Sequence, residues 1–216
     1  MKIMQLLLCL LLGTVGTAAL AASPAPSWEV GKHYFLIEPA QPTATGDKIE
    51  VLEVFSYACP HCADFQPVAE KIRAALPANA QWVYMPAEFQ PTWAVFARAF
   101  YTASALGILD KTHQPLFNAI HVDHKIPLSA SIEDLSNFYA KYGVKAEDFL
   151  QTSKSFAIET KLKQARNSVK AYMVEGTPTI IVNGKYRLTN ASAGGYDELI
   201  ALIQYLIHQE TAAQKK

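Results

Sequence analysis

Two cysteines, Cys59 and Cys62, are separated only by Pro60 and His61. This spacing places the second thiol one helical turn after the first, close enough for the two sulfurs to form a disulfide. An apolar, β-branched and aromatic run ends shortly before Cys59, so we expect this residue to start a helix, where unpaired backbone N–H groups and the helix dipole stabilise a thiolate. Pro60 suits the first helical turn, where no N–H is needed. The segment predicts a redox pair in which Cys59 is the nucleophile and Cys62 resolves the mixed disulfide.

Two further side chains are candidates for tuning this pair. His61 can donate a hydrogen bond, or lend partial positive charge, to the Cys59 thiolate; the alternative is an exposed helix residue. Glu53 is the polar residue of the apolar run 51–55, and an unpaired buried carboxylate is costly. A proton-transfer role towards Cys62 would explain its place in that run. The alternative is a strand-edge glutamate that reaches water.

A close cysteine pair can also be a structural disulfide or half of a zinc site. A two-residue loop leaves a crosslink little chain entropy to remove, so a structural disulfide here has low value. Zinc needs two further ligands, normally a second cysteine pair or two histidines. His121 and His124 lie one helical turn apart, but we interpret them as surface residues. We therefore predict redox chemistry with no metal and no other cofactor.

A second turn is expected beside the cysteine helix. The sequence Gly176-Thr177-Pro178-Thr179 precedes a predicted strand. X–Pro bonds are cis in only about 5% of cases. In this topology, however, a cis Pro178 would leave the backbone of Thr177 free to pair with an extended substrate as an added strand. Thr177 and Pro178 are therefore our candidates for substrate binding.

The first residues predict an export signal. Lys2 supplies a positive start, residues 6–12 form a short apolar run, and residues 19–21 fit a small-x-small cleavage pattern. The apolar stretch is too short to span a membrane, so we expect segment 1–21 to be removed. Cys9 leaves with it, and a single close pair is not a disulfide scaffold. The 19 basic and 19 acidic residues balance, which gives no indication of a nucleic-acid partner.

The order of predicted elements indicates a small mixed sheet with helices inserted midway. Residues 22–28 are small and proline-rich and should form a flexible lead. The pattern between residues 92 and 174 is helical, and the sequence 131–134 resembles a capping box. Asn183-Gly184 then suits a type I′ hairpin turn. The expected strands are 34–37, 49–57, 81–85, 179–182 and 185–188, and the expected helices outside the insertion include 60–76 and 196–209.

The chain resembles the DsbA family of bacterial periplasmic disulfide oxidoreductases. The resemblance rests on the run 51–55 leading into Cys59-Pro60-His61-Cys62, on the Thr177-Pro178 turn and on segment 182–186. It implies an α/β, thioredoxin-like fold with a central mixed sheet and an inserted helical domain. It also implies a cis Pro178 and the relay role for Glu53. The expected division is a thioredoxin-like domain over 29–91 and 175–216, with the helical domain over 92–174.

The resemblance further implies that the Cys59–Cys62 disulfide is donated to newly exported, reduced or unfolded polypeptides in the periplasm. A quinone-linked membrane oxidase of the DsbB type would then reoxidise the pair. Thr177 departs from the best-known members, which have an aliphatic residue there, while isomerase relatives also carry threonine; substrate and partner preference are left open.

The sequence leaves two alternative functions open. One is a disulfide isomerase or reductase of the same fold, and the other is a peptide-binding chaperone with idle cysteines. Isomerases of this kind usually carry an N-terminal dimerisation domain, and about 27 residues between the cleavage point and the first core strand are too few for one. We therefore expect a monomer.

Overall fold

The computed structural model describes residues 27–214. The predicted signal segment 1–21 and most of the lead lie outside the described residues. None of the helices within 27–214 combines the length and the apolar character that crossing a membrane requires.

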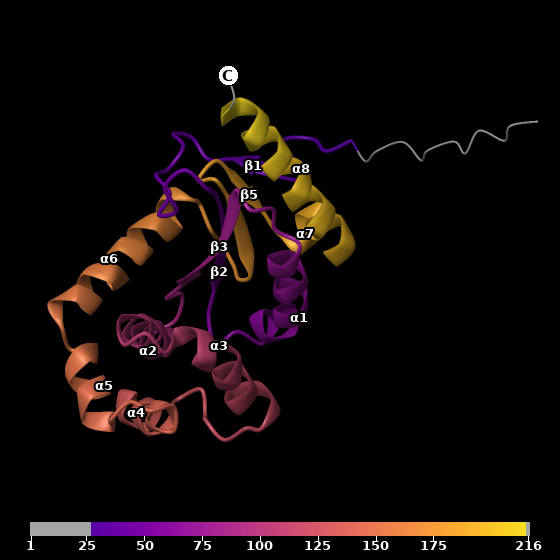
Figure 1. The fold of residues 1–216 in the computed structure, drawn as a ribbon. Coiled ribbons are helices and arrows are strands. Elements are labelled where there is room, and N and C mark those ends of the chain that lie inside the picture. The colour runs from indigo at the N-terminus through magenta and orange to yellow at the C-terminus, as the bar shows by residue number, and fades with distance from the viewer. Residues whose placement is uncertain (1–26, 215–216) are drawn as a thin grey trace, which may run out of the picture.

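A five-stranded mixed sheet forms the centre of the described chain (Figure 1). The strand order is β1-β5-β4-β2-β3. β2 runs parallel to β3 and antiparallel to β4, so it has a hydrogen-bonded neighbour on each side. The strands are β1 (Phe35–Leu36), β2 (Ile49–Phe55), β3 (Ala80–Pro86), β4 (Thr179–Val182) and β5 (Tyr186–Leu188).

All seven residues of β2 are buried, as the nearly continuous apolar run predicts for a strand covered on both faces. Helices α1 and α8 lie on one face of the sheet, and α6 lies on the other (Figure 1). The strands differ from prediction mainly at their ends: β1 is two residues long and β2 stops at Phe55. The helices are α1 (Pro60–Ala74), α2 (Trp93–Ala105), α3 (Leu109–Phe117), a π-helical segment η1 (Asn118–Val122), α4 (Ile132–Ala140), α5 (Ala146–Ser153), α6 (Phe156–Ala171), α7 (Asn190–Ala193) and α8 (Tyr196–Gln214).

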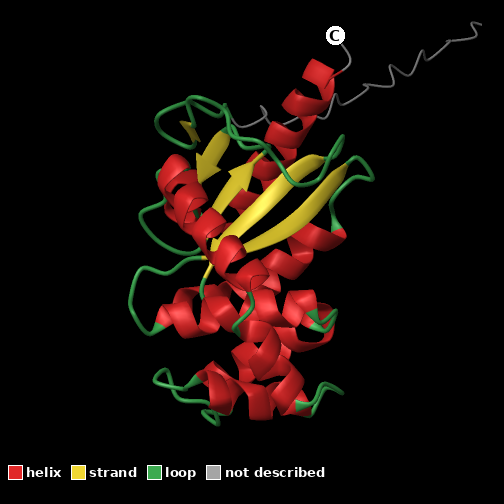
Figure 2. Cartoon of the chain, turned by 90° about the vertical axis from the view of Figure 1, so that its left-hand side faces the viewer, coloured by secondary structure: helices red, strands yellow, loops and turns green. Residues whose placement is uncertain are grey.

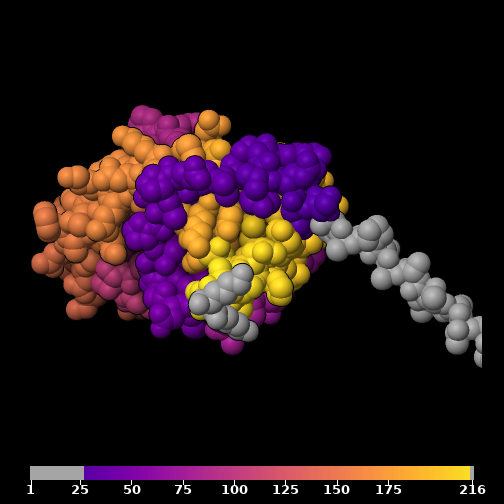
Figure 3. Space-filling model, turned by 90° about the horizontal axis from the view of Figure 1, so that it is seen from above, coloured from indigo at the N-terminus to yellow at the C-terminus, as the bar shows by residue number. Residues whose placement is uncertain are grey.

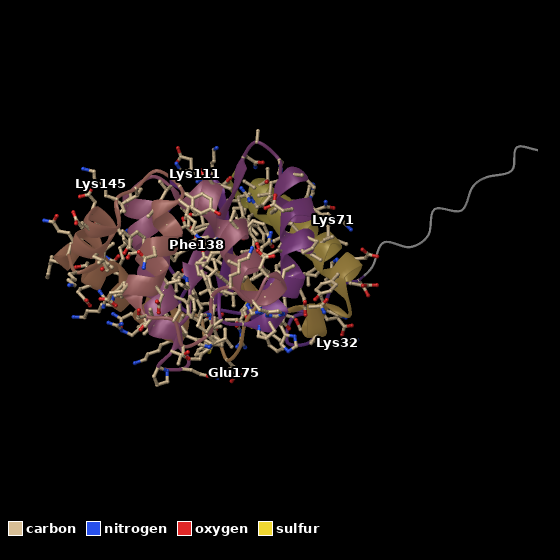
Figure 4. The ribbon with its side chains drawn as sticks, turned by 90° about the horizontal axis from the view of Figure 1, so that it is seen from below. Lys32, Lys71, Lys111, Phe138, Lys145 and Glu175 are labelled. Atoms are coloured by element: carbon tan, nitrogen blue, oxygen red, sulfur yellow. The ribbon has the colours of Figure 1, made fainter. Side chains whose placement is uncertain are left out.

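Helices α2 to α5 and η1 form a helical block at one end of the sheet (Figure 2). Their aromatic and aliphatic side chains share one core with Phe55, Tyr57 and the two cysteines. Phe138 lies among the helices when the block is seen from below, whereas Lys111 and Lys145 extend outward (Figure 4). The α4 capping box predicted from the sequence is present, with Ser131 as its N-cap. The redox pair therefore lies where the sheet meets the helical block.

Helix α6 packs against both the helical block and the sheet. Ile158 and Leu162, in its first half, pack against Ala97 of α2. Ala165 and Val169, in its second half, pack with the side chains of β2 and β4. The domain boundaries at residues 92 and 174 stay a prediction, because this helix contributes to two cores.

The β4–β5 hairpin is closed by the predicted turn. Asn183 and Gly184 have φ angles of 52° and 65°, as a type I′ turn requires. Glycine is also needed for space, because a Cβ at position 184 would lie 2.1 Å from the Gln41 carbonyl oxygen. The N-terminal segment, in indigo, passes over the hairpin, in orange, on the surface of the molecule (Figure 3). Gln41 N donates a hydrogen bond to Gly184 O at 2.9 Å. Helix α7, after the hairpin, was not predicted from the sequence.

A buried carboxylate fastens α8 to the same hairpin. Glu210 is 3% exposed. It accepts hydrogen bonds from Lys185 Nζ at 2.6 Å, Asn183 Nδ2 at 2.5 Å and Tyr186 Oη at 2.9 Å. Burial alone would raise the pKa of this carboxyl, but the three hydrogen bonds outweigh burial and hold the pKa below its ordinary value of 4.5.

Replacing Glu210 by glutamine should lower the free energy of unfolding at neutral pH by about 1–3 kcal/mol, since it weakens a charge-assisted network. The depressed pKa fixes the pH dependence: the contribution is complete above the unfolded-state pKa and is lost as the pH falls through the folded-state value. Urea unfolding of both proteins at about pH 7 and about pH 3 measures the difference. An equal gap at both pH values would contradict the assignment.

Candidate active site

The turn between β2 and α1 presents the first thiol. Ser56 organises this turn: its carbonyl accepts from Cys59 N at 3.1 Å and its Oγ accepts from Ala58 N at 3.2 Å. Cys59 is the N-cap of α1 with extended backbone angles, and Pro60 follows in the first helical turn. The strand, turn and helix therefore place Cys59 at a helix N-terminus, as the spacing predicts.

The two thiols are free and lie in different environments. Cys62 is fully buried, whereas Cys59 is 5% exposed. The pKa of Cys59 is lowered, first by a hydrogen bond from the Cys62 thiol and further by Thr177 and by the backbone N–H groups of Cys62 and His61; burial opposes these effects. The pKa of Cys62 is raised, mainly by burial and then by its hydrogen bond to Cys59 and the charge there. At neutral pH the pair therefore holds one thiolate, on Cys59.

His61 contributes to this thiolate through its backbone. Its N–H is one of the groups that lower the Cys59 pKa, whereas its side chain is exposed. Within residues 27–214 the His61 ring makes no hydrogen bond to a protein atom. The proposed action of the imidazole on the thiolate therefore stays a prediction.

The Thr177-Pro178 turn lies against the nucleophile. The peptide bond between these residues is cis, as the resemblance implies. Cys59 Sγ lies 3.5 Å from the Thr177 carbonyl oxygen and donates a hydrogen bond to it when the thiol is protonated. The Thr177 hydroxyl lowers the pKa of both thiols. Its Oγ1 is buried and makes no hydrogen bond of ordinary geometry among the described residues. A groove of about 510 Å³ borders this turn and extends to β5 and residues 189–191.

Glu53 lies in the central strand and is fully buried. The alternative of a strand-edge glutamate reaching water is therefore wrong. Neither carboxyl oxygen has a hydrogen-bond partner among the described residues. Burial raises the pKa of Glu53 to about 8; Arg73 lowers it, and a charge on Cys59 raises it further. The carboxyl is close enough to Cys62 for its charge to raise the thiol's pKa.

Tyr57, His113 and His121 are part of the site, although the sequence did not reveal them. Tyr57 Oη lies 2.8 Å from His113 Nδ1, and the Tyr57 carbonyl oxygen lies 2.7 Å from His121 Nε2. Burial lowers the pKa of His113 to about 3, so this ring is neutral. The interpretation of His121 and His124 as a surface pair is wrong for His121, which is half-buried and hydrogen-bonded; His124 is exposed. No local signal marks these contacts, because they join residues 56 and 64 positions apart.

Known proteins share both the sequence and the fold. A family model described as DSBA-like thioredoxin domain matches residues 50–201. The thiol:disulfide interchange protein DsbA of Pseudomonas aeruginosa is 40% identical over 195 residues, which cover 90% of this chain and 92% of that protein. The chain belongs to the DsbA family. It is thus an oxidoreductase of the thiol:disulfide interchange class with a thioredoxin-like fold.

Two solved DsbA structures have a fold similar to that of this chain. A crystal structure of a point variant of P. aeruginosa DsbA superimposes with a TM-score of 0.82 at 39% identity, covering 86% of this chain and all of that one. A variant of Proteus mirabilis DsbA, in complex with the non-covalently bound peptide PWATCDS, gives a TM-score of 0.71 at 25% identity and covers 85% of this chain and all of that one.

In the reduced protein, Cys59 should react with iodoacetamide far faster than Cys62, because Cys59 is ionised and Cys62 is buried with a raised pKa. The pH midpoint of the reaction should lie well below the value of about 8.5 for a free thiol. Mass spectrometry after timed quenching gives the rate at each cysteine. Equal rates at the two sites, or a midpoint like that of a free thiol, would contradict the arrangement.

Proposed function

We propose that the protein donates the Cys59–Cys62 disulfide to reduced cysteines of newly exported polypeptides in the bacterial periplasm. The observation that carries this proposal is the place of Cys59 at the N-terminus of α1, where backbone N–H groups, the Cys62 thiol and the Thr177 side chain lower its pKa. A stabilised thiolate favours the reduced form, so the oxidised form gives up its disulfide readily. DsbA is itself the standard example of this relation between a stabilised reduced form and a strong oxidant.

The exchange proceeds in two displacements. A substrate thiolate attacks Cys59 Sγ, the Cys59–Cys62 bond breaks, and Cys62 leaves and takes up a proton. A second substrate thiolate then attacks the substrate sulfur of the mixed disulfide and expels the Cys59 thiolate. The substrate loses two electrons and gains a disulfide, and the cysteine pair gains those electrons. Reoxidation requires an acceptor, for which we propose a quinone-linked membrane oxidase of the DsbB type.

The surface around Thr177 suits an extended polypeptide. The backbone N–H of Thr177 makes no hydrogen bond to a described residue, and its carbonyl lies beside Cys59 Sγ. An extended segment can pair with this backbone as an added strand and bring its own cysteine to Cys59. The structure of the Proteus mirabilis relative contains a non-covalently bound, cysteine-bearing peptide, which supports a polypeptide as the substrate.

Glu53 is proposed to exchange a proton with Cys62. Cys62 must gain a proton when it leaves the disulfide and lose it before attack, yet it is fully buried. A carboxyl with a pKa of about 8 can give or accept a proton at neutral pH. This role accounts for an unpaired carboxyl in the central strand, which would otherwise be only a cost to folding.

Glu53→Gln should slow the attack of Cys62 on a mixed disulfide at Cys59 by about tenfold or more, because the proton acceptor is removed. It should also raise stability at neutral pH. Wild-type Glu53 has a raised pKa, so its contribution is present below the unfolded pKa and is lost as the pH rises through the folded value.

Glu50→Gln is the matched control for this prediction. Glu50 lies in the same strand, is 3% exposed and has a pKa raised by burial, but it accepts a hydrogen bond from Ala44 N at the other end of the strand. Stopped-flow measurement of the release of a Cys59-linked peptide compares the three proteins. An unchanged release rate in Glu53→Gln would refute the relay.

The direction of exchange separates an oxidase from a reductase or isomerase. In an oxidising extract, which supplies the disulfides that the lone Cys59 thiolate attacks, Cys62→Ser should accumulate mixed disulfides between Cys59 and periplasmic polypeptides, whereas a chaperone with idle cysteines would trap none. In the wild type, the oxidised form should be less stable than the reduced form at neutral pH, because only the reduced form contains the stabilised thiolate. This difference should shrink in acid, since a group with a depressed folded pKa loses its contribution as the pH falls through that value.

Denaturant unfolding of both redox forms at neutral pH and at about pH 3 measures the difference in stability. An oxidised form that is the more stable at neutral pH would overturn the oxidase proposal and favour the reductase alternative. Action as a monomer remains part of the proposal, and gel filtration with light scattering tests it.

A further inference from the structure

The turn that carries the nucleophile depends on a contact from outside the thioredoxin-like sheet. Ser56 holds the backbone N–H groups of Ala58 and Cys59. The carbonyl of Tyr57, which lies between Ser56 and Ala58 in the chain, has one hydrogen-bond partner among the described residues, which is His121 Nε2 at 2.7 Å. Tyr57 is 1% exposed, so this carbonyl has little access to water. His121 is therefore the group that satisfies the turn's buried acceptor.

The contact also fixes the state of His121. A carbonyl oxygen only accepts hydrogen bonds, so Nε2 of His121 must carry a proton. His121 lies in η1, the π-helical segment that follows α3. Short π-helical segments occur frequently at functional sites, because they change which way a side chain faces. The irregular part of the helical block is thus the part that reaches the active-site turn.

A second contact holds the same residue by its side chain. Tyr57 Oη is paired with His113 Nδ1 at 2.8 Å, and the Tyr57 ring packs against Phe55 and Phe117 at centroid distances of 5.1 Å and 4.9 Å. The side chain is thus anchored without His121. His121 adds a hydrogen bond that holds the peptide unit between Tyr57 and Ala58, just before Cys59.

We propose that His121 is a positioning residue for the redox reaction, acting on Cys59 through the Tyr57 carbonyl. The Cys59 thiolate is stabilised by N–H groups of His61 and Cys62, and such stabilisation depends on where those donors lie relative to the sulfur. Release of the Tyr57 carbonyl lets the peptide plane turn and shifts Cys59 relative to the helix N-terminus. The inference rests on the redox role of Cys59, but not on whether the protein acts as oxidase or reductase.

His121→Phe and His121→Gln test the proposal as a pair. Phenylalanine keeps an aromatic ring beside Phe117, whose ring centroid is 6.2 Å from that of His121, but it cannot donate. Glutamine keeps an N–H donor at a similar reach. His208→Phe is the matched control, because His208 is exposed on α8 and no hydrogen bond involves its ring in the described part of the chain.

Two quantities are measured for each full-length protein: the pH midpoint of Cys59 alkylation, and the equilibrium constant of the disulfide with glutathione. In His121→Phe the midpoint should rise and the protein should become less oxidising, with a change in the equilibrium constant of about threefold to tenfold. Glutamine should restore both quantities towards wild type, and His208→Phe should leave them unchanged.

A merely structural contact gives a different result. It would destabilise the oxidised and reduced forms equally, so the equilibrium constant with glutathione would not move. Wild-type values for the midpoint and the equilibrium constant in a folded His121→Phe protein would therefore overturn the proposal. If His121→Phe does not fold, His121→Gln still tests the proposal. A folded His121→Gln protein with a raised alkylation midpoint and a less oxidising equilibrium constant would also overturn the proposal. Neither outcome bears on the direction of exchange, which the stability of the wild-type redox forms decides.

Discussion

A negative charge on one sulfur must be stabilised with almost no help from charged side chains, and the architecture follows from that constraint. The donors to Cys59 are the thiol of Cys62, the Thr177 side chain and backbone N–H groups at the start of α1. Hydrogen bonds of this kind are short-ranged and directional. The end of β2, the start of α1 and the turn before β4 must therefore meet at one point. The two-sided pairing of β2, with β3 and β4, brings them there.

The helical block completes the site from the side opposite to the sheet. It supplies His113 and His121, which hold Tyr57 by its hydroxyl and its carbonyl. It also buries both cysteines in a core that is rich in aromatic residues. Burial opposes ionisation of Cys59 and strongly disfavours ionisation of Cys62. The same low-polarity surroundings thus make the two thiols unequal, because only Cys59 has enough donors to offset them.

The sequence predicts those parts of the site that depend on local patterns. A stretch of about a dozen residues contains the apolar run, Pro60 and the Cys59–Cys62 spacing. Together they predict that the nucleophile lies at a helix start. The approximate strand ranges and the Asn183-Gly184 turn follow from equally local patterns. For His121 the sequence offers only a metal ligand or, as we interpret it, a surface residue, because its partner is 64 residues away and is a backbone carbonyl, which carries no sequence signature. The roles of Glu53 and His61 stay predictions, since position alone does not establish proton transfer or charge stabilisation.

Helix α6 joins the sheet to the helical block, and this connection bears on which polypeptides the protein can accept. One half of the helix is part of the core with α2, and the other half is part of the core beneath the sheet. A hinge between sheet and helical block would have to separate one of these packed surfaces, as well as the contacts of Tyr57 with His113 and His121. These contacts therefore oppose a hinge motion that would change the surface around Cys59. A surface that opens little around its target is better suited to a flexible polypeptide than to a compact folded domain, which agrees with the proposed action on newly exported chains.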